Sequence, residues 1–383
     1  VHQARGVRRA LQGRADYPRG GNAMTAGIVG LGLIGGSFAR ALREKGHTVF
    51  AYDADYPTVL AAKAAEAIDA PCTESALSAS DFIIIALYPS AAAEFLEKNA
   101  DVIPKSATVI DACGTKRKVC EECGKIAEAH GFTFIGGHPM AGSEKTGLSN
   151  ASETLLENAY YIITPTTKSP SPAVEELTGL VRSLGAIPLV LGYEQHDYAT
   201  AAISHLPHVI AYSLVNLVRE SDDENEIMKT IAAGGFKDIT RIASSSPVMW
   251  ENICLSNQEQ ILKLLDSYIH TLEVMRTNIA DADSPALLDA FTAAKDYRDS
   301  ITITAKGALK NVYELYLDLI DETGGIATVA TILASNNLSI KNIGIIHNRE
   351  FEGGVLRLEM YDGESLALAV ALLKKHHYTI YER

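Results

Sequence analysis

The histidine at position 138 has the surroundings of an acid–base group. It lies in residues 132–144, which read as a short apolar strand followed by a loop of glycines, a proline and this one imidazole. Loops at strand ends often carry chemistry, because a rigid sheet aims them. An imidazole presented there can exchange a proton near neutral pH. The stretch alone leaves equally open a histidine that only hydrogen-bonds within a turn.

Two other stretches could supply partners for His138. Thr115 follows a predicted strand and could offer a hydroxyl at the same edge of the sheet, cap the next helix, or do both. In the stretch Ser204-His205-Leu-Pro-His208, the two histidines share one helix face. A metal would need a third ligand, and none stands nearby in the sequence. The pattern therefore favours a paired binding role or a core role over a metal site.

Arg241 is a candidate for holding an anionic group. It stands among small and apolar residues in the segment 234–243. An arginine there is costly to bury unless it meets an anion, and its planar fork suits a carboxylate. The alternative is an ion pair within the protein, for instance with Asp238. Trp250, the only tryptophan, follows nine residues later and could wall a pocket, although a lone tryptophan is more often plain core.

A glycine-rich turn predicts a nucleotide site. Gly30, Gly32 and Gly35 stand in the order G-x-G-x-x-G between an apolar strand and a helical stretch. Gly30 would make the tight turn, Gly32 would let the backbone approach a pyrophosphate, and Gly35 would let the helix pack close on the strand. The first helical residues, Leu33 and Ile34, belong to the same predicted site, because unpaired N–H groups at a helix N-terminus face the phosphates.

Asp53 indicates which dinucleotide binds. It follows the next strand, at 48–52, and falls 18 positions after Gly35, the spacing typical of a Rossmann fold. Its carboxylate can accept hydrogen bonds from a ribose diol and would repel a 2′-phosphate, which favours NAD over NADP. The alternative, a structural turn without a ligand, fits this strand–turn–helix–strand context poorly.

The elements that must position these residues begin with a doubly wound parallel sheet. Apolar strands separated by helical patterns predict an α/β Rossmann-type domain over residues 24–192. Besides 26–30 and 48–52, strands are expected at 81–87, 108–111, 133–135, 160–164 and 187–191. The carboxyl ends of these strands would bring the candidate groups to one edge.

An all-α domain is expected next, over residues 193–310. Strand signals vanish after residue 194, and helical periodicity is clear at 198–219 and 251–279. These helices are too apolar for the surface of a monomer, so we expect them to form the core of a homodimer.

A third unit is expected at residues 312–383. Strands at 314–320, 339–346, 354–361 and 379–381 alternate with helices at 325–336 and 364–377. Strand–helix–strand–strand–helix–strand is the ferredoxin-like α+β plan. Its short loops show no obvious catalytic constellation.

Composition excludes several classes of protein. The 383 residues are 47% hydrophobic and 21% charged, within the globular range, and their number predicts two or three domains. The net charge of −13 argues against a nucleic-acid partner. No apolar run approaches the roughly 18 residues that span a bilayer, so no membrane association is expected. The five cysteines form no disulfide framework, and the C-x-x-C at Cys120 and Cys123 has no second pair at zinc-site spacing. We therefore expect reduced thiols, a cytoplasmic protein and no metal site.

Residues 1–23 differ from the rest of the chain. They contain five arginines and one aspartate, and they lack both an apolar core and a cleavage-like end. This composition argues against a secretory signal. We expect a disordered arm or an extension added upstream, with Met24 as the natural start.

Four motifs in this order resemble those of the prephenate dehydrogenase family of tyrosine biosynthesis. They are the nucleotide loop with Asp53, His138-Pro-Met-Ala-Gly-Ser-Glu144, Ser204-His-Leu-Pro-His208 and Phe236-Lys-Asp-Ile-Thr-Arg241, within residues 24–309. The first motif is shared with many dehydrogenases, whereas the other three together are specific. The tail from Val312 resembles an ACT domain, the regulatory module that binds amino acids. Gly324, Gly325 and Ile326 fall where ACT domains bind their effectors.

The resemblance implies NAD-dependent oxidative decarboxylation of prephenate to 4-hydroxyphenylpyruvate. His138 would accept a hydrogen bond from the ring hydroxyl and act as the base. Thr115 would support it, in a position where many relatives have serine. Arg241 would hold a substrate carboxylate with help from His208, and the substrate site would include Ser204 and Trp250. Tyrosine is the expected inhibitor, at the ACT unit or in the active site.

Two alternatives remain open. One is an arogenate or dual-specificity cyclohexadienyl dehydrogenase, because no residue in the sequence identifies the group that reads the substrate side chain. The other is a catalytically silent sensor of NAD and an amino acid. The presence of His138, Arg241 and the full nucleotide loop argues against the sensor.

Overall fold

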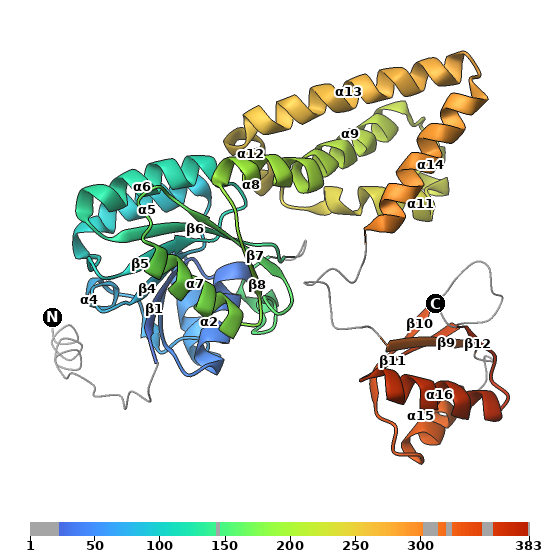
Figure 1. The fold of residues 1–383 in the computed structure, drawn as a ribbon, viewed down its shortest axis with the longest axis horizontal. Helices are drawn as coiled ribbons and strands as arrows, with labels where there is room; N and C mark the ends of the chain where they lie inside the picture. Colours follow the sequence, from blue (N-terminus) through green and yellow to red (C-terminus); the bar gives the residue numbers. More distant parts are fainter. Residues whose placement is uncertain (1–22, 143–145, 302–312, 319–323, 347–354, 382–383) are drawn as a thin grey trace. The chain divides into compact units, whose positions relative to one another are not determined.

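A computed structural model describes residues 23–142, 146–301, 313–318, 324–346 and 355–381. The expectations for residues 1–22 therefore lie outside the described part of the chain. The chain divides into two compact units between Asp299 and Ser300. The first unit holds a large sheet with its helices and a group of long helices, and the second holds a small sheet with two helices (Figure 1).

The large sheet confirms the predicted strands and adds one. Its spatial order is β3-β2-β1-β4-β5-β6-β7-β8. The strands are β1 (Thr25–Val29), β2 (Thr48–Tyr52), β3 (Ala70–Pro71), β4 (Phe82–Ile85), β5 (Thr108–Asp111), β6 (Thr133–Pro139), β7 (Tyr160–Pro165) and β8 (Ile187–Val190). The two-residue strand β3 carries too little pattern for a sequence-based prediction.

Helices cover both faces of this sheet. They are α2 (Leu33–Glu44), α3 (Tyr56–Ala64), α4 (Glu74–Leu77), α5 (Pro89–Asn99), α6 (Arg117–His130) and α7 (Ser171–Ser183). In β4, Ile84 points into one core with α2 and α7, while Ile83 and Ile85 point into the other with α5 and α6. Burial of each isoleucine stabilises the fold by roughly 1.5–3 kcal/mol. Because both faces are covered, the strand reads as a continuous apolar run.

The expectation of an all-parallel sheet is wrong at one edge. Strands β1 to β6 pair in parallel, but β7 runs antiparallel to β6, with His138 opposite Ile162, and β8 then pairs in parallel with β7. Each strand was predicted at its place, but an apolar run does not encode its direction. The sheet is therefore mixed, with a parallel Rossmann core.

The prediction that His138 lies in a loop is also wrong. Strand β6 continues through Gly136, Gly137 and His138 to Pro139. Close packing explains the two glycines, because a Cβ on Gly136 would overlap Thr164 and one on Gly137 would overlap the Tyr161 hydroxyl. The segment that resembles a loop in sequence is therefore a strand that packs closely against neighbouring side chains.

The helical part of the first unit follows directly. It comprises α8 (Tyr193–Thr200), a wide turn (Ala201–His205), α9 (Leu206–Ser221), α10 (Ile227–Ile231), α11 (Gly234–Thr240), a 3-10 turn (Arg241–Ser244), α12 (Pro247–Ser256), α13 (Gln258–Ala280) and α14 (Ser284–Ser300). The stretch of helical periodicity at 251–279 forms parts of two helices, α12 and α13, which are divided at Asn257, and the Asn257 side chain contacts α8 and the wide turn.

The run Tyr193–Ser221 is long and apolar enough to cross a membrane by length and composition, and 17% of its apolar window is buried. It also carries His196, Asp197 and His205, all buried and hydrogen-bonded to other parts of the first unit. These polar contacts identify it as a helix of the helical domain. Its exposed apolar residues, such as Ile203 and Leu217, agree with a surface that a second subunit covers.

The second unit has the predicted ferredoxin-like order. It consists of β9 (Tyr313–Asp318), α15 (Gly325–Ala334), β10 (Ile340–Ile346), β11 (Val355–Met360), α16 (Gly363–Lys375) and β12 (Ile380–Tyr381). The strands form one antiparallel sheet in the order β10-β11-β9-β12. Both helices pack on one face, where Leu315, Leu358, Val329 and Leu373 are fully buried.

Candidate active site

The nucleotide loop has the geometry that its glycines predict. Gly30 has a φ of +91°, and a Cβ on Gly35 would overlap the Gly30 carbonyl oxygen. A Cβ on Gly32 would meet nothing within 4 Å. Gly32 caps α2 without a side-chain hydrogen bond, so the first-turn N–H groups of α2 are open. Open space in front of these N–H groups fits a pyrophosphate.

Asp53 lies beside this loop, as the sequence predicts. Its Oδ2 accepts a hydrogen bond from the Leu31 backbone N–H at 2.7 Å, and its Oδ1 accepts one from Asp55 N–H at 2.9 Å. The carboxylate is thus fixed next to the glycine turn, at the carboxyl end of β2. These residues fit the adenosine side of NAD, with a ribose diol at Asp53.

His138 lies near the carboxyl end of β6, at the same sheet edge as the nucleotide loop. Its Nδ1 is 2.8 Å from Nε2 of His196, on α8. Its Nε2 faces the loop after β5, where a Cβ on Gly114 would lie 3.8 Å away. Burial first, and then the charges of His196, Lys116 and His205, hold the pKa of His138 well below its usual range. The imidazole is therefore neutral at neutral pH and can accept a proton.

A buried ion pair supports the strand below His138. Lys116 and Asp111 are fully buried and paired, and Lys116 Nζ also donates to the Gly137 carbonyl at 2.6 Å. Asp111 accepts hydrogen bonds from the backbone N–H groups of Gly137 and Cys113. Burial is the largest effect and lowers the pKa of Lys116, but Asp111 together with Cys113 and Cys120 outweighs it, so the net shift of the pKa is upward. These contacts fix the ends of β5 and β6 relative to each other.

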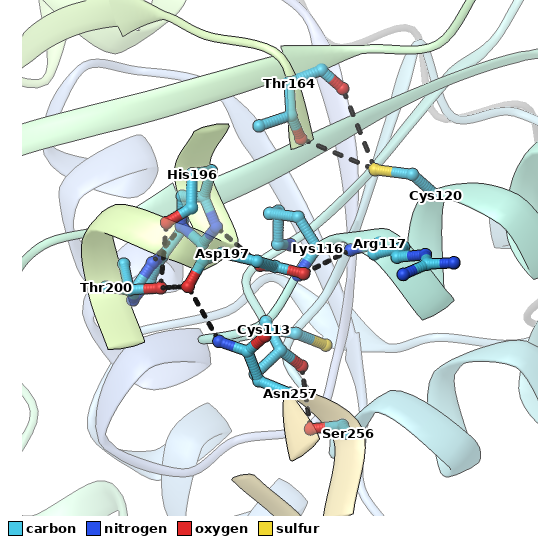
Figure 2. A network of polar contacts seen from close by, with 12 residues as sticks. Cys113, Lys116, Arg117, Cys120, Thr164, His196, Asp197, Thr200, Ser256 and Asn257 are labelled. Carbon is cyan, nitrogen blue, oxygen red and sulfur yellow. Dashed lines mark hydrogen bonds and ion pairs between the residues drawn. The ribbon is translucent and has the colours of Figure 1, made fainter. Parts of the chain in front are cut away.

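Asp197 joins the helical part to the Rossmann part. Its carboxylate accepts hydrogen bonds from the Lys116 and Arg117 backbone N–H groups, at 2.7 and 2.8 Å, at the start of α6 (Figure 2). His196 Nδ1 lies 2.8 Å from the same carboxylate, and Asn257 Nδ2 donates to the Asp197 carbonyl. A carboxylate at a helix N-terminus is favourable, because it meets unpaired N–H groups and the positive end of the helix dipole.

Thr115 lies in the loop after β5, close to His138 in the fold. Its hydroxyl donates to Ser256 Oγ on α12 at 3.0 Å. No hydrogen bond joins Thr115 to His138, both of which lie in the described part of the chain. In this structure Thr115 therefore helps to hold α12 at the sheet edge, and His196 is the hydrogen-bond partner of His138.

The predicted substrate residues gather around Trp250. Its ring stacks on His208 at 3.6 Å and meets His205 edge-on at 6.0 Å. His208 Nδ1 donates to the Ser204 carbonyl at 2.8 Å. Burial first, and then the positive charge of Arg241, lower the pKa of His208 against the opposing effect of that carbonyl. The structure thus brings Ser204, His208, Trp250 and Arg241 to one region of the helical domain.

His205 has a different place from His208. It is buried, and its Nδ1 lies 3.1 Å from Asn257 Nδ2. Burial lowers its pKa to about 4. Within the described ranges no cluster of three or more His, Cys, Asp or Glu side chains could hold a metal ion.

Sequence reasoning missed His196, Asp197, Asn257 and the Lys116–Asp111 pair. Asp111 and Lys116 are charged residues at and just after the end of an apolar strand, whereas His196, Asp197 and Asn257 stand among other polar residues and carry no local signal. The contact between His138 and His196 joins residues 58 positions apart, and only the docking of α8 on the sheet edge creates it.

Comparisons with known proteins agree with this architecture. The family model for the prephenate dehydrogenase nucleotide-binding domain matches residues 38–189, and that for the prephenate dehydrogenase dimerization domain matches residues 193–293. The chain is 39% identical over 336 residues to a prephenate dehydrogenase of Bacillus subtilis (strain 168), covering 86% of this chain and 90% of that protein.

Two solved structures are similar in fold. One is a prephenate dehydrogenase from A. aeolicus in complex with hydroxyphenyl propionate and NAD+, with a TM-score of 0.69 and 28% identity, covering 74% of this chain and all of that one. The other is an arogenate dehydrogenase from Synechocystis, with a TM-score of 0.66 and 28% identity, covering 73% of this chain and all of that one.

Proposed function

Because the chain belongs to the prephenate dehydrogenase family, we propose that it catalyses the NAD-dependent oxidative decarboxylation of prephenate to 4-hydroxyphenylpyruvate, with His138 as the base. One observation carries this proposal. The neutral imidazole of His138 stands at the sheet edge that bears the nucleotide loop, and the helical domain contributes its hydrogen-bond partner.

The chemistry of prephenate matches these groups. The ring hydroxyl gives its proton to Nε2 of His138 as that carbon is oxidised. NAD, when bound, accepts the hydride from this ring carbon. The ring carboxylate leaves as CO2, its electron pair makes the ring aromatic, and the ring oxygen takes the proton back from Nε2 of His138. A base placed in this way contributes about 10²–10⁴-fold to the rate.

The remaining substrate groups fit the helical domain. Arg241 supplies a guanidinium for a substrate carboxylate, and its charge already acts on His208. His208 is held by the Ser204 carbonyl and by stacking on Trp250, so it can orient that carboxylate without reorganising. Thr115 contributes through its bond to Ser256, which fixes α12 and therefore the position of Trp250.

An arogenate dehydrogenase is the second candidate. The Synechocystis arogenate dehydrogenase and the A. aeolicus prephenate dehydrogenase are both 28% identical to this chain. The two substrates differ only at the side chain, which is an amino acid in arogenate and a keto acid in prephenate. A dual-specificity cyclohexadienyl enzyme lies between the two.

The second unit serves as an ACT domain that binds tyrosine, in our proposal. Its ferredoxin-like order supports this assignment. Gly324 has a φ of +94° and caps α15 without a side-chain hydrogen bond, Gly325 is buried, and Ile326 is 39% exposed. An effector at this turn would meet open N–H groups. The protein acts as a cytoplasmic homodimer, with the exposed apolar faces of its helical domain paired.

The test is an assay of NADH formation with purified protein. Prephenate and arogenate are compared with NAD and NADP, each with and without tyrosine. The proposal expects turnover with prephenate and NAD, no comparable turnover with NADP, and inhibition by tyrosine. Turnover with arogenate alone would move the assignment to the second candidate. No NADH from either substrate would reject a dehydrogenase and favour a sensor of NAD and an amino acid.

A further inference from the structure

We propose that His196 and Asp197 are positioning residues that hold His138 in the one neutral tautomer able to accept a proton at Nε2. The inference deepens the proposed function and rests on it for its catalytic meaning. It concerns a chain of three side chains, Asp197–His196–His138, which runs from the middle of α8 to the end of β6.

The chain is continuous and buried at its inner end. Asp197 Oδ1 lies 2.8 Å from His196 Nδ1, and His196 Nε2 lies 2.8 Å from His138 Nδ1. The two imidazole rings meet edge-on, with centroids 5.0 Å apart and an interplanar angle of 70°. His196 is fully buried, and Asp197 is 2% exposed. Both links have the length of ordinary hydrogen bonds.

The direction of each hydrogen bond follows from Asp197. Its two oxygens accept the backbone N–H groups of Lys116 and Arg117, which are donors only. An ionised carboxylate is itself an acceptor only, and both of its oxygens already face backbone donors at the start of α6. His196 Nδ1 must therefore carry the hydrogen that it gives to Asp197.

The remaining assignments are forced by the valence of a neutral imidazole. With its hydrogen on Nδ1, His196 has a lone pair on Nε2 and accepts from His138 Nδ1–H. His138 then has its own lone pair on Nε2, on the side that faces Gly114. The opposite tautomer of His138 would place a hydrogen on Nε2 and could not accept the substrate proton.

The same chain stabilises the product of proton transfer. When His138 takes the substrate proton at Nε2, it becomes an imidazolium whose Nδ1–H already points at His196. The charge then faces a polarised imidazole backed by the Asp197 carboxylate. No proton needs to move along the chain, and no other reactant is required. The arrangement is an Asp–His orienting pair in the sense of the serine protease triad, applied to a second imidazole.

The other charged and polar groups around His138 do not orient its imidazole, because each is bound to another partner. Lys116, whose charge acts on His138, is engaged by Asp111 and the Gly137 carbonyl. His205 hydrogen-bonds to Asn257, and Thr115 donates to Ser256. Lys116 and His205 disfavour the imidazolium, and Asp197 is the carboxylate of this network that is bound to His196, the partner of His138.

Nitrogen NMR of the full-length protein labelled with 15N-histidine tests the tautomer directly. The signals of His138 are identified by their loss in His138→Gln. Wild-type protein at neutral pH is expected to show a hydrogen on Nδ1 and a bare Nε2. A hydrogen on Nε2 in the wild type would overturn the proposal. This readout needs neither substrate nor turnover, so it stands even if the protein fails to oxidise prephenate.

Kinetics of matched variants test the consequence. Gln at position 196 can place an amide oxygen near the original Nε2, whereas Leu cannot, so His196→Gln should keep a kcat at least tenfold above that of His196→Leu. Asp197→Asn, which lets an amide donate to His196 and reverse the chain, should lower kcat by about 10²–10⁴-fold with little change in KM.

The control is His130→Gln, at the far end of α6 from Lys116. It should keep wild-type kcat and show that loss of a histidine alone has no effect. Equal kcat in His196→Gln and His196→Leu, at equal thermal stability, would overturn the positioning role. If wild-type protein forms no NADH from prephenate or arogenate, the proposed function fails, and the NMR result still decides the tautomer.

Discussion

His138 Nδ1 and His196 Nε2 lie 2.8 Å apart. His138 lies at the end of strand β6, and His196 lies on α8, the first helix of the helical domain. Because of this contact, the Rossmann domain and the helical domain both contribute residues to the site. The strand sets the position of the base, and the helix sets which of its nitrogens is free. Any change in how the helical domain docks on the sheet edge should therefore appear in catalysis.

Substitutions at two glycines of the nucleotide loop should separate an effect on NAD binding from an effect on the stability of the fold. Gly32→Ala adds a methyl group to open space at an ordinary φ of −70°, so the fold should be retained while NAD binding weakens. Gly35→Ala places a Cβ onto the Gly30 carbonyl and should cost about 1–3 kcal/mol of stability. Thermal unfolding and NAD titration of both variants check this contrast, and equal loss of stability in the two would contradict it.

The pH dependence of activity follows from the lowered pKa of His138. The base must be neutral to act, and burial, His196 and Lys116 keep it neutral below its ordinary pKa of 6.5. We expect kcat/KM for prephenate to stay level as the pH falls from neutrality through 6.5, and to decline only further down. A pH profile measured with NAD at saturation checks this. A decline centred at or above pH 6.5 would argue against the buried environment of the base.

The stability of the fold should also fall in acid. His205 has a folded-state pKa of about 4 because it is buried, whereas in the unfolded chain it titrates near 6.5. The unfolded state therefore binds more protons between these values. The free energy of unfolding should drop as the pH falls from about 6.5 to 4, by at most about 1.4 kcal/mol per pH unit for this group. Denaturant unfolding at fixed protein concentration measures the slope, which should be shallower in His205→Gln than in the wild type.

A stripe of exposed apolar residues on α13 predicts the subunit contact. Leu262, Ile269, Leu272 and Ile279 are between 46% and 62% exposed and recur along one face of the helix. Ile269→Asp together with Leu272→Asp should dissociate the dimer in sedimentation equilibrium. Ser267→Asp, on the other side of the same helix, is the matched control. A double variant that stays dimeric would place the contact elsewhere.

The strands and helices were largely predictable, because apolar runs and helical periodicity report burial directly. The whole second unit, from β9 to β12, was predicted in its order. Strand direction was not, since the residues of β7 are equally apolar whichever way the strand runs. The end of β6 differs from the prediction because Gly136 and Gly137 resemble a loop in sequence, whereas close packing against Thr164 and Tyr161 requires these small residues.

Some residues of the candidate site could likewise be predicted from sequence and others could not. Gly30, Gly35, Asp53 and His138 carry local motifs, so sequence could place them. His196 and Asp197 carry none, because their role arises from a contact across the chain and from the N-terminus of α6. Thr115 was expected at the same sheet edge as His138, and sequence did not predict that its hydroxyl donates to Ser256. The partner of a side chain depends on how the helices dock on the sheet, and sequence patterns do not report that docking.

The most direct test of the account is the turnover number of His138→Asn with prephenate and NAD, compared with the wild type. The amide cannot take the ring hydroxyl's proton, so kcat for NADH formation should fall by about 10²–10⁴-fold. Binding of NAD and the thermal unfolding temperature should stay close to wild type, since the nucleotide loop and the cores are untouched. A kcat equal to that of the wild type would contradict the central claim that His138 is the base.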